Sequence, residues 1–284
     1  MRFRWGTLLI PSFVLSFLLL AVTQITFMRA SFFKDLGLGL LDDKFQLTNY
    51  IRVFSDPFYL SSLKLTVYVS ALVVIFSLAF GYPMAYMLAR MRSRLATVLL
   101  AAVVITPFIT IVIKVLGLII IFSADGPLNS FLKGVGIIDT SVKLMGTVTG
   151  VVVGLLHYTL GFTVVVLFSV IQTIPVSLED AAQIHGACRW RVFWRVVIPL
   201  SVPGIVAAGL INFNLSMGAF TAAALMGGGR VLTLPVLIQR TIMLESKYGM
   251  AGALSAVLLV TVLLINLVSA FSVSRLRKTR RGIT

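Results

Sequence analysis

Long apolar stretches separated by short polar segments dominate the chain. They cover residues 7–28, 63–88, 96–122, 146–171, 203–224 and 249–272. Each is close to the roughly 20 residues that a helix rising about 1.5 Å per residue needs to cross about 30 Å of hydrocarbon. Helices are expected because lipid offers the backbone no hydrogen-bond partners, and the stretches lack the alternation typical of a barrel. The pattern predicts an all-α integral membrane protein with six transmembrane helices.

The composition agrees with a protein that lies in a bilayer. Hydrophobic residues make up 59% of the chain and charged residues 12%, with a mean hydropathy of +1.05. A soluble domain has about 45–50% apolar and 25% charged residues. The composition excludes a disordered protein, a cytosolic enzyme, and, with Cys188 as the single cysteine, a disulfide-stapled module.

The basic residues predict the orientation of the spans. With the N-terminus inside, the inner segments hold thirteen basic and two acidic residues, and the outer segments hold ten basic and seven acidic residues. This asymmetry predicts that both termini are cytoplasmic. Lys114 is the remaining basic residue, interpreted as a side chain that extends to the outer surface. The first stretch is interpreted as an anchor rather than a cleaved signal peptide, because no A-x-A site follows it.

We expect the spans to form a single transmembrane domain over residues 1–284. Its parts are a first span at 7–28, an extracytoplasmic loop at 29–62, a five-helix core at 63–272 with a cytoplasmic loop at 172–203, and a basic tail at 273–284. The extracytoplasmic loop should contain a short interfacial helix. The basic tail should bind lipid headgroups rather than nucleic acid. Pro83 and Pro107 lie inside apolar stretches and predict kinks.

The cytoplasmic loop reads PVSLEDAAQIHGACRWRVFWRVVIPLSVPG. A short helix should begin with Ser177 as its N-cap, with acidic residues in its first turn, and end at Gly186. A second, amphipathic helix with Trp190 and Trp194 on its apolar side should follow until Pro199 ends it. The loop therefore predicts a helix-turn-helix at the inner membrane surface.

This loop resembles the cytoplasmic EAA loop of binding-protein-dependent ABC importer permeases. The family pattern is E-A-A, three residues, Gly, nine residues, I-x-L-P. The spacing is reproduced by Asp180, Ala181, Ala182, Gly186, Val196, Val197, Ile198 and Pro199, with Asp180, Val196 and Ile198 as conservative departures. The resemblance extends over about residues 45–272 and is to the polyamine-type subgroup, which also has relatives for iron, opines and phosphonates.

The resemblance implies a type I ABC importer permease fold in the bacterial cytoplasmic (inner) membrane. It implies as partners a second permease, two ABC ATPase subunits and an extracytoplasmic solute-binding protein. The ATPase-coupling residues would be Glu179, Asp180, Ala181, Ala182, Gly186, Arg189 and Pro199. The alternative for this loop is an amphipathic helix that only lies on anionic lipid. The resemblance leaves open the solute and whether the two permeases are identical.

Motifs for catalysis, metal binding and nucleotide binding are missing from the sequence. A P-loop needs G-x-x-x-x-G-K-[ST], and the glycine cluster at 227–229 has neither the spacing nor the lysine. ATP and Mg²⁺ should therefore be bound by the partner ATPase, with no cofactor on this chain. No catalytic or metal site is expected, because His157 and His185 lie in different parts of the chain and Cys188 has no neighbouring cysteine.

Polar residues within the spans are candidates for the substrate path. Asn212 and Ser216 share one helix face, Asn214 projects about 200° away, and His157 lies at a similar depth. The alternative is that they form interhelical hydrogen bonds that only hold the bundle together. The main alternative to an ABC importer permease is an ion-coupled secondary transporter, and a membrane enzyme is a more distant alternative. Ion coupling usually needs an intramembrane carboxylate, and none of the nine acidic residues lies in a predicted span.

Overall fold

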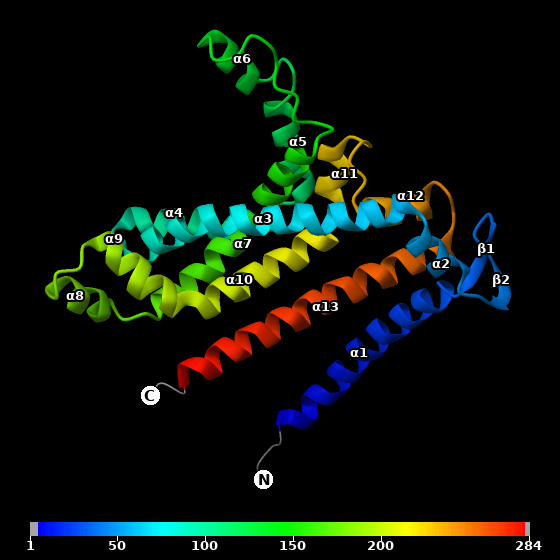
Figure 1. The fold of residues 1–284 in the computed structure, drawn as a ribbon, viewed down its shortest axis with the longest axis horizontal. Helices are drawn as coiled ribbons and strands as arrows, with labels where there is room; N and C mark the ends of the chain where they lie inside the picture. The colour runs from blue at the N-terminus through cyan, green and yellow to red at the C-terminus, as the bar shows by residue number, and fades with distance from the viewer. Residues whose placement is uncertain (1–4, 282–284) are drawn as a thin grey trace. The chain divides into compact units, whose positions relative to one another are not determined.

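The structure is a computed structural model that describes residues 5–281, with side chains described for residues 11–271. Arg2 and Arg4, two of the thirteen basic residues counted for the inner segments, lie outside the described residues, as do the side chains of the basic tail. The elements in chain order are α1 (Trp5–Ala30), β1 (Phe33–Gly37), β2 (Leu40–Phe45), α2 (Thr48–Ser55), α3 (Pro57–Arg90), α4 (Arg94–Ile105), η1 (Thr106–Phe108), α5 (Ile111–Ile121), α6 (Pro127–Gly134), α7 (Val148–Gln172), α8 (Val176–Ile184), α9 (Arg189–Val192), η2 (Phe193–Val197), α10 (Ile198–Gly218), α11 (Thr221–Gly227), α12 (Leu234–Met243) and α13 (Tyr248–Arg281) (Figure 1).

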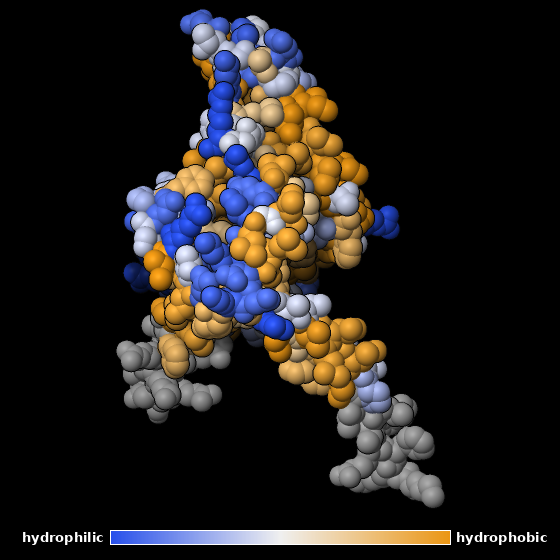
Figure 2. All heavy atoms as spheres, turned by 90° about the vertical axis from the view of Figure 1, so that its right-hand side faces the viewer, coloured by the Kyte–Doolittle hydropathy of each residue, from blue (hydrophilic) through white to orange (hydrophobic). Residues whose placement is uncertain are grey.

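The predicted helical character is confirmed. Among the described residues, five helices are long and apolar enough to cross a membrane, and a bent pair of helices makes a sixth if it counts as one span. Hydrophobic side chains cover much of the face shown in Figure 2. In α1, for example, Phe13, Phe17 and Leu20 are each exposed by more than 60%. Such a surface is stable only against lipid or other protein.

The prediction of one continuous helix over residues 96–122 is wrong. The span is broken into two parts. The first part is α4 with η1, the second is α5, and the two are bent by 104° relative to each other. Pro107 lies in η1, just before the break, and its missing N–H and its ring are incompatible with a regular α-helix at this point. The kink predicted at this proline is therefore a full break. By contrast, α3 continues as one helix through Pro83.

The predicted helix end at Pro199 is also wrong. The helical segment that begins at Arg189 continues to Gly218. A π-turn, η2, lies directly before the proline, and the Ile198 N–H donates to the carbonyl of Phe193, five residues earlier. This wider turn accommodates Pro199 without ending the helix. The span predicted to reach residue 224 ends instead at Gly218, and α11 follows as a separate short helix.

The chain divides into two compact units. The first comprises residues 5–63 with 237–261. It contains α2, the short helix predicted in this loop, and an antiparallel β1–β2 hairpin that the all-α prediction missed. The Asp35 carboxylate accepts hydrogen bonds from the N–H groups of Gly249 and Met250, both at 2.8 Å, at the N-terminus of α13. A carboxylate at this position satisfies unpaired helical donors and complements the helix dipole.

The second unit comprises residues 64–236 with 262–281, and α7 lies at its centre. Helix α7 packs against α4, α5, α10 and α11 (Figure 1). Small residues bring α7 and α10 close together: a Cβ atom at Gly204 would lie 2.7 Å from Val170. One buried apolar cluster surrounds Val151 and Leu155, and a second surrounds Leu167 and Ile171. The second cluster supports the loop that carries the candidate site.

Candidate functional site

The loop at 172–203, predicted to be cytoplasmic, forms a helix-turn-helix as the sequence predicts. Its first helix, α8, begins after Pro175, so the predicted N-cap role of Ser177 is wrong. Pro175 is the N-cap residue, with φ −59° and ψ 130°, and no side chain caps the helix there. The helix ends at Gly186, which has φ +84° and donates its N–H to the carbonyl of Gln183 at 2.9 Å. The Ala187 N–H donates to the carbonyl of Ala182 at 3.0 Å, completing a Schellman motif.

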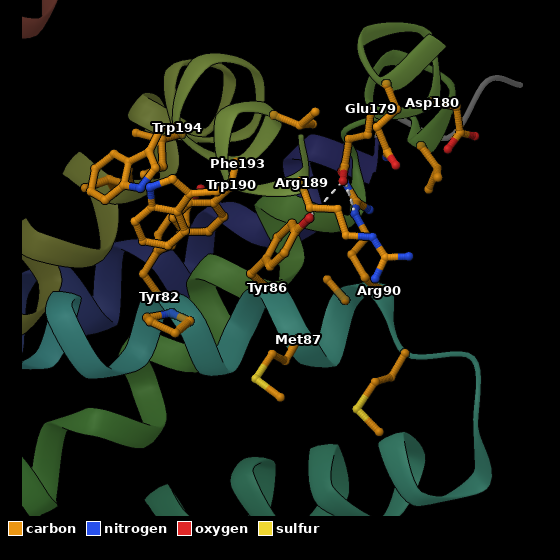
Figure 3. A pocket seen from close by; sticks show the side chains of 18 of the residues that line it. Tyr82, Tyr86, Met87, Arg90, Glu179, Asp180, Arg189, Trp190, Phe193 and Trp194 are labelled. Atoms are coloured by element: carbon orange, nitrogen blue, oxygen red, sulfur yellow. Dashed lines mark hydrogen bonds and ion pairs between the residues drawn. The ribbon is translucent and has the colours of Figure 1, made fainter. Parts of the chain in front are cut away.

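Glu179 attaches α8 to the end of α3. Its carboxylate lies 2.6 Å from the Arg90 Nη2 and 2.7 Å from the Arg90 Nε, and the Tyr86 hydroxyl donates to its other oxygen at 2.9 Å (Figure 3). Arg90 also donates to the carbonyl of Ile174 at 3.1 Å. The Glu179 residue is 6% exposed. This buried ion pair fixes the first turn of α8 to a membrane-crossing helix.

Other residues of α8 and of the turn that follows it are exposed to solvent. Asp180, Ala181, Ile184 and Gly186 are exposed, and Ile184 is exposed by 84%. Ala182 is half-buried. We call these four exposed residues the α8 face. A slim surface with small side chains, one apolar tip and one carboxylate suits close docking into a protein socket.

The second helix of the loop carries a cluster of aromatic residues. The ring of Phe193 contacts Trp190, Trp194, Tyr82 and Tyr86 at centroid distances of 5.1–5.9 Å. Trp190 is exposed by 69% and Trp194 by 51%. These residues border a cavity of about 1290 Å³, which Arg189 also lines. Pro199 is half-buried where the helix enters α10.

The structure separates the residues predicted to line the substrate path. Asn212 is 1% exposed and donates to the Thr163 hydroxyl of α7 at 2.8 Å, and the Ser216 hydroxyl donates to Asn212 at 3.3 Å. A further pair, Ser77 and Thr159, lies 3.3 Å apart between α3 and α7. This buried seam is the arrangement expected of interhelical hydrogen bonds. A role of Asn212 and Ser216 in the path stays a prediction.

Asn214 and His157 are exposed, as residues of a path would be. The side chain of Asn214 exchanges hydrogen bonds with Asn266 of α13 at 2.9 and 3.3 Å. His157 lies on α7 within a candidate span. The interpretation of Lys114 as a side chain that extends to the outer surface is wrong, because this residue is only 7% exposed. The 104° bend before α5 turns this part of the chain away from the direction that a straight span would take.

Sequence reasoning missed the partners of Glu179. Arg90 and Tyr86 are 89 and 93 residues away from it, and in the sequence Arg90 counts only as one of the thirteen basic residues of the inner segments. A basic residue at the inner end of a span is expected for topology alone, so no signal in one sequence singles out this pairing.

The structure defines a helical membrane protein with a helix-turn-helix between two of its candidate spans. Comparison with known proteins then identifies its family. Residues 77–282 match the family described as "Binding-protein-dependent transport system inner membrane component", and the chain belongs to this family. It is a multi-pass inner-membrane protein and the permease component of a binding-protein-dependent ABC importer.

Relatives and solved structures agree with this assignment. The chain is 33% identical over 232 residues to the spermidine/putrescine transport system permease protein PotB of Escherichia coli K12, covering 82% of this chain and 84% of that protein. It is 27% identical to the sulfate transport system permease protein CysW of Synechocystis, covering 76% and 78%. A bacterial alginate ABC transporter chain, solved with a periplasmic protein bound to an alginate pentasaccharide, matches with a TM-score of 0.80 at 20% identity over 96% of this chain and 94% of that one. The MetNI methionine ABC transporter matches with a TM-score of 0.60 at 19% identity over 76% and 94%.

Proposed function

We propose that this permease pairs with a second permease to enclose a path for a small polar solute, which an extracytoplasmic binding protein delivers. Two ATPase subunits bind ATP and Mg²⁺ on the inner side and dock on the α8 face. The observation that carries this proposal is the exposed α8 face on a helix that the Arg90–Glu179 ion pair ties to α3. Movement of an ATPase subunit can thereby reach a membrane-crossing helix without passing through a flexible loop.

The proposal includes six spans with both termini inside, and two contacts between distant segments support it. Arg90 and Glu179 both belong to predicted inner segments and form an ion pair. The Gly146 N–H donates to the carbonyl of Met226 at 2.8 Å, and both residues lie at predicted outer ends of spans. Each contact joins segments on the same predicted side, as the alternation of six spans requires.

Expression of this chain with its genomic neighbours tests the proposed function. We expect an ATPase subunit to co-purify with the permease, and uptake into vesicles to require ATP inside and the binding protein outside. An ion-coupled secondary transporter predicts the opposite: uptake driven by a proton or sodium gradient by the isolated chain. Gradient-driven uptake without ATP would reject the proposal. The same preparation identifies the second permease as an identical or a homologous chain.

A further inference from the structure

The cavity of about 1290 Å³ beside the aromatic cluster lies between α3 on one side and α8, α9, η2 and α10 on the other (Figure 3). All of its lining residues belong to the second unit of the chain. Of the α8 face, only Asp180 contributes to the lining, so the proposed docking of the ATPase leaves the cavity without an assigned ligand. Its volume exceeds the roughly 300–1,000 Å³ of a typical small-molecule site. The cavity therefore has room for a large ligand.

The lining of the cavity along α3 changes from apolar to cationic. From Leu78 to Met87 the lining residues of this helix are apolar or aromatic. At 1.5 Å per residue they cover about 14 Å, close to half of the roughly 30 Å hydrocarbon core of a bilayer. Arg90 and Arg92 follow directly, at the end of α3 and just after it. This wall thus matches the depth of one lipid leaflet with its headgroup layer.

The opposite wall shows the same change at the same end. It runs antiparallel to α3, since the Ser201 and Tyr82 hydroxyls lie 2.6 Å apart and the ring of Phe193 lies 5.1 Å from that of Tyr86. Figure 3 shows the aromatic side chains toward one end of the cavity and the charged ones toward the other. In the direction of the charged end, the lining residues of this wall are Ile205, Ile198, Trp194, Trp190 and Arg189.

The charged end of the cavity favours an anionic group. Arg90 is paired with Glu179. Arg92 and Arg189 are exposed, and their guanidinium groups make no hydrogen bond or ion pair with the described residues. Asp180 is the only other carboxylate of the lining, so three arginines face two acidic residues. Guanidinium groups bind phosphate oxygens through charge-assisted hydrogen bonds.

The two exposed tryptophans place this end of the cavity at a membrane surface. Trp190 and Trp194 are exposed by 69% and 51%. Indole rings are enriched where the hydrocarbon core meets the headgroups, because they are apolar and carry one N–H donor. The α3 and α10 walls both belong to candidate spans. The cavity therefore combines a lipid-facing apolar part with a cationic end at headgroup depth.

We propose that this cavity binds one anionic phospholipid, with an acyl chain along the apolar lining of α3 and α10 and its phosphate between Arg92 and Arg189. A soluble anion would use the arginines and leave the apolar lining empty, whereas an amphiphile fits both parts. The site goes beyond the proposed function, since it holds for any solute. A lipid bound there contacts the helices that the Arg90–Glu179 pair joins and supports their attachment.

Photo-cross-linking of the full chain with its co-purified subunits, in phosphatidylcholine nanodiscs, tests the site. The probe is a small fraction of phosphatidylglycerol with a photoactivatable group at the end of one acyl chain. Mass spectrometry then locates the labelled peptides. We expect labelling of residues 78–87 and 194–205, which contain the apolar lining. Excess unlabelled phosphatidylglycerol should compete with the probe, and phosphatidylcholine should not.

Two double variants separate a defined site from general attraction to an anionic membrane. Arg92→Gln with Arg189→Gln should lower the labelling about tenfold or more, because basic residues near a membrane surface strengthen the binding of anionic lipid. Arg94→Gln with Arg191→Gln is the matched control. These two arginines are also exposed, lie two residues further along each segment and do not line the cavity, so this variant should label like the wild type.

A third variant tests the apolar part alone. Ala79 is exposed and lines the cavity, so Ala79→Trp fills the space of the acyl chain while every charge remains. It should also lose labelling.

Four results would overturn the site. They are equal labelling in the two double variants, retained labelling in Ala79→Trp, displacement of the probe by inorganic phosphate as effectively as by phosphatidylglycerol, and absence of label from both segments in the wild type. The third would indicate a site for soluble anions, and the fourth would be expected if another subunit covers the cavity.

Discussion

Replacing Gly186 by valine is expected to lower transport and solute-stimulated ATP hydrolysis about tenfold or more in a permease that still folds and inserts. Gly186 has φ +84°, and a Cβ atom there would meet nothing within 4 Å. The substitution therefore creates no clash within the chain, but it strains the backbone by about 1–2 kcal/mol. The backbone can relieve this strain by shifting the α8 face away from its docking position. A loss of about 1.4 kcal/mol in the binding of the ATPase to this face lowers the affinity tenfold. The measurements are ATPase co-purification and solute-stimulated hydrolysis in reconstituted membranes.

Gly136 provides a matched control. It follows α6 with φ +73° and open space at its Cβ position, and the surrounding N–H groups form the same pair of hydrogen bonds as at Gly186. Gly136→Val thus causes the same local strain in a segment predicted to lie outside, and should leave coupling intact. If the loop were only a lipid anchor, Gly186→Val would be harmless and Trp190→Ala would be the damaging variant. Normal coupling in Gly186→Val would contradict the coupling role.

Replacing Glu179 by glutamine is expected to separate ATP hydrolysis from transport. The substitution leaves Arg90 without its charged partner at a site where the two side chains are 16% and 7% exposed. Removal of one member of a buried ion pair costs about 3–5 kcal/mol. The first turn of α8 would then detach from α3 while the α8 face stays intact. We expect the ATPase to bind and hydrolyse ATP, with transport per ATP reduced about tenfold or more.

The other ion pair of the described residues gives the control for this variant. Lys247 and Glu245 are exposed by 42% and 39%, and a pair of this kind contributes about 0–1 kcal/mol, so Glu245→Gln should transport normally. Tyr86→Phe removes one hydrogen bond to Glu179 and should have an intermediate effect. The exchange Arg90→Glu with Glu179→Arg should recover part of the transport. If Glu179→Gln and the wild type transported equal amounts of solute per ATP, the ion pair would not transmit movement of the ATPase from α8 to α3.

Much of the fold was predictable because the bilayer restricts the choice of structure. A long apolar stretch in lipid must form a helix, so hydropathy alone located α1, α3, α7 and α13. Local chemistry also predicted the end of α8, since a positive φ at Gly186 needs no long-range contact. The break at Pro107 and the π-turn before Pro199 were missed, because both prolines lie in apolar sequence and their outcome depends on packing.

The site was predictable only where it is local in sequence. The turn between the two helices follows from Gly186, which lies seven residues after Glu179 in the first turn of α8. The attachment of Glu179 to Arg90 depends on how α3 and α8 meet, and the burial of Lys114 depends on the bend of the third span. Tertiary packing determines both, and neither leaves a periodic signal in the sequence.

Cross-linking of the α8 tip tests the central claim, that the α8 face docks on an ATPase subunit. Ile184→Cys in a Cys188→Ser background places one thiol at the tip, and Val135→Cys places one at an exposed position predicted to lie outside. In the assembled transporter, a short bifunctional reagent should join Ile184→Cys, and not Val135→Cys, to the ATPase, with a yield that changes when ATP binds. Absence of any ATPase cross-link from Ile184→Cys in a transporter that retains transport would contradict the account.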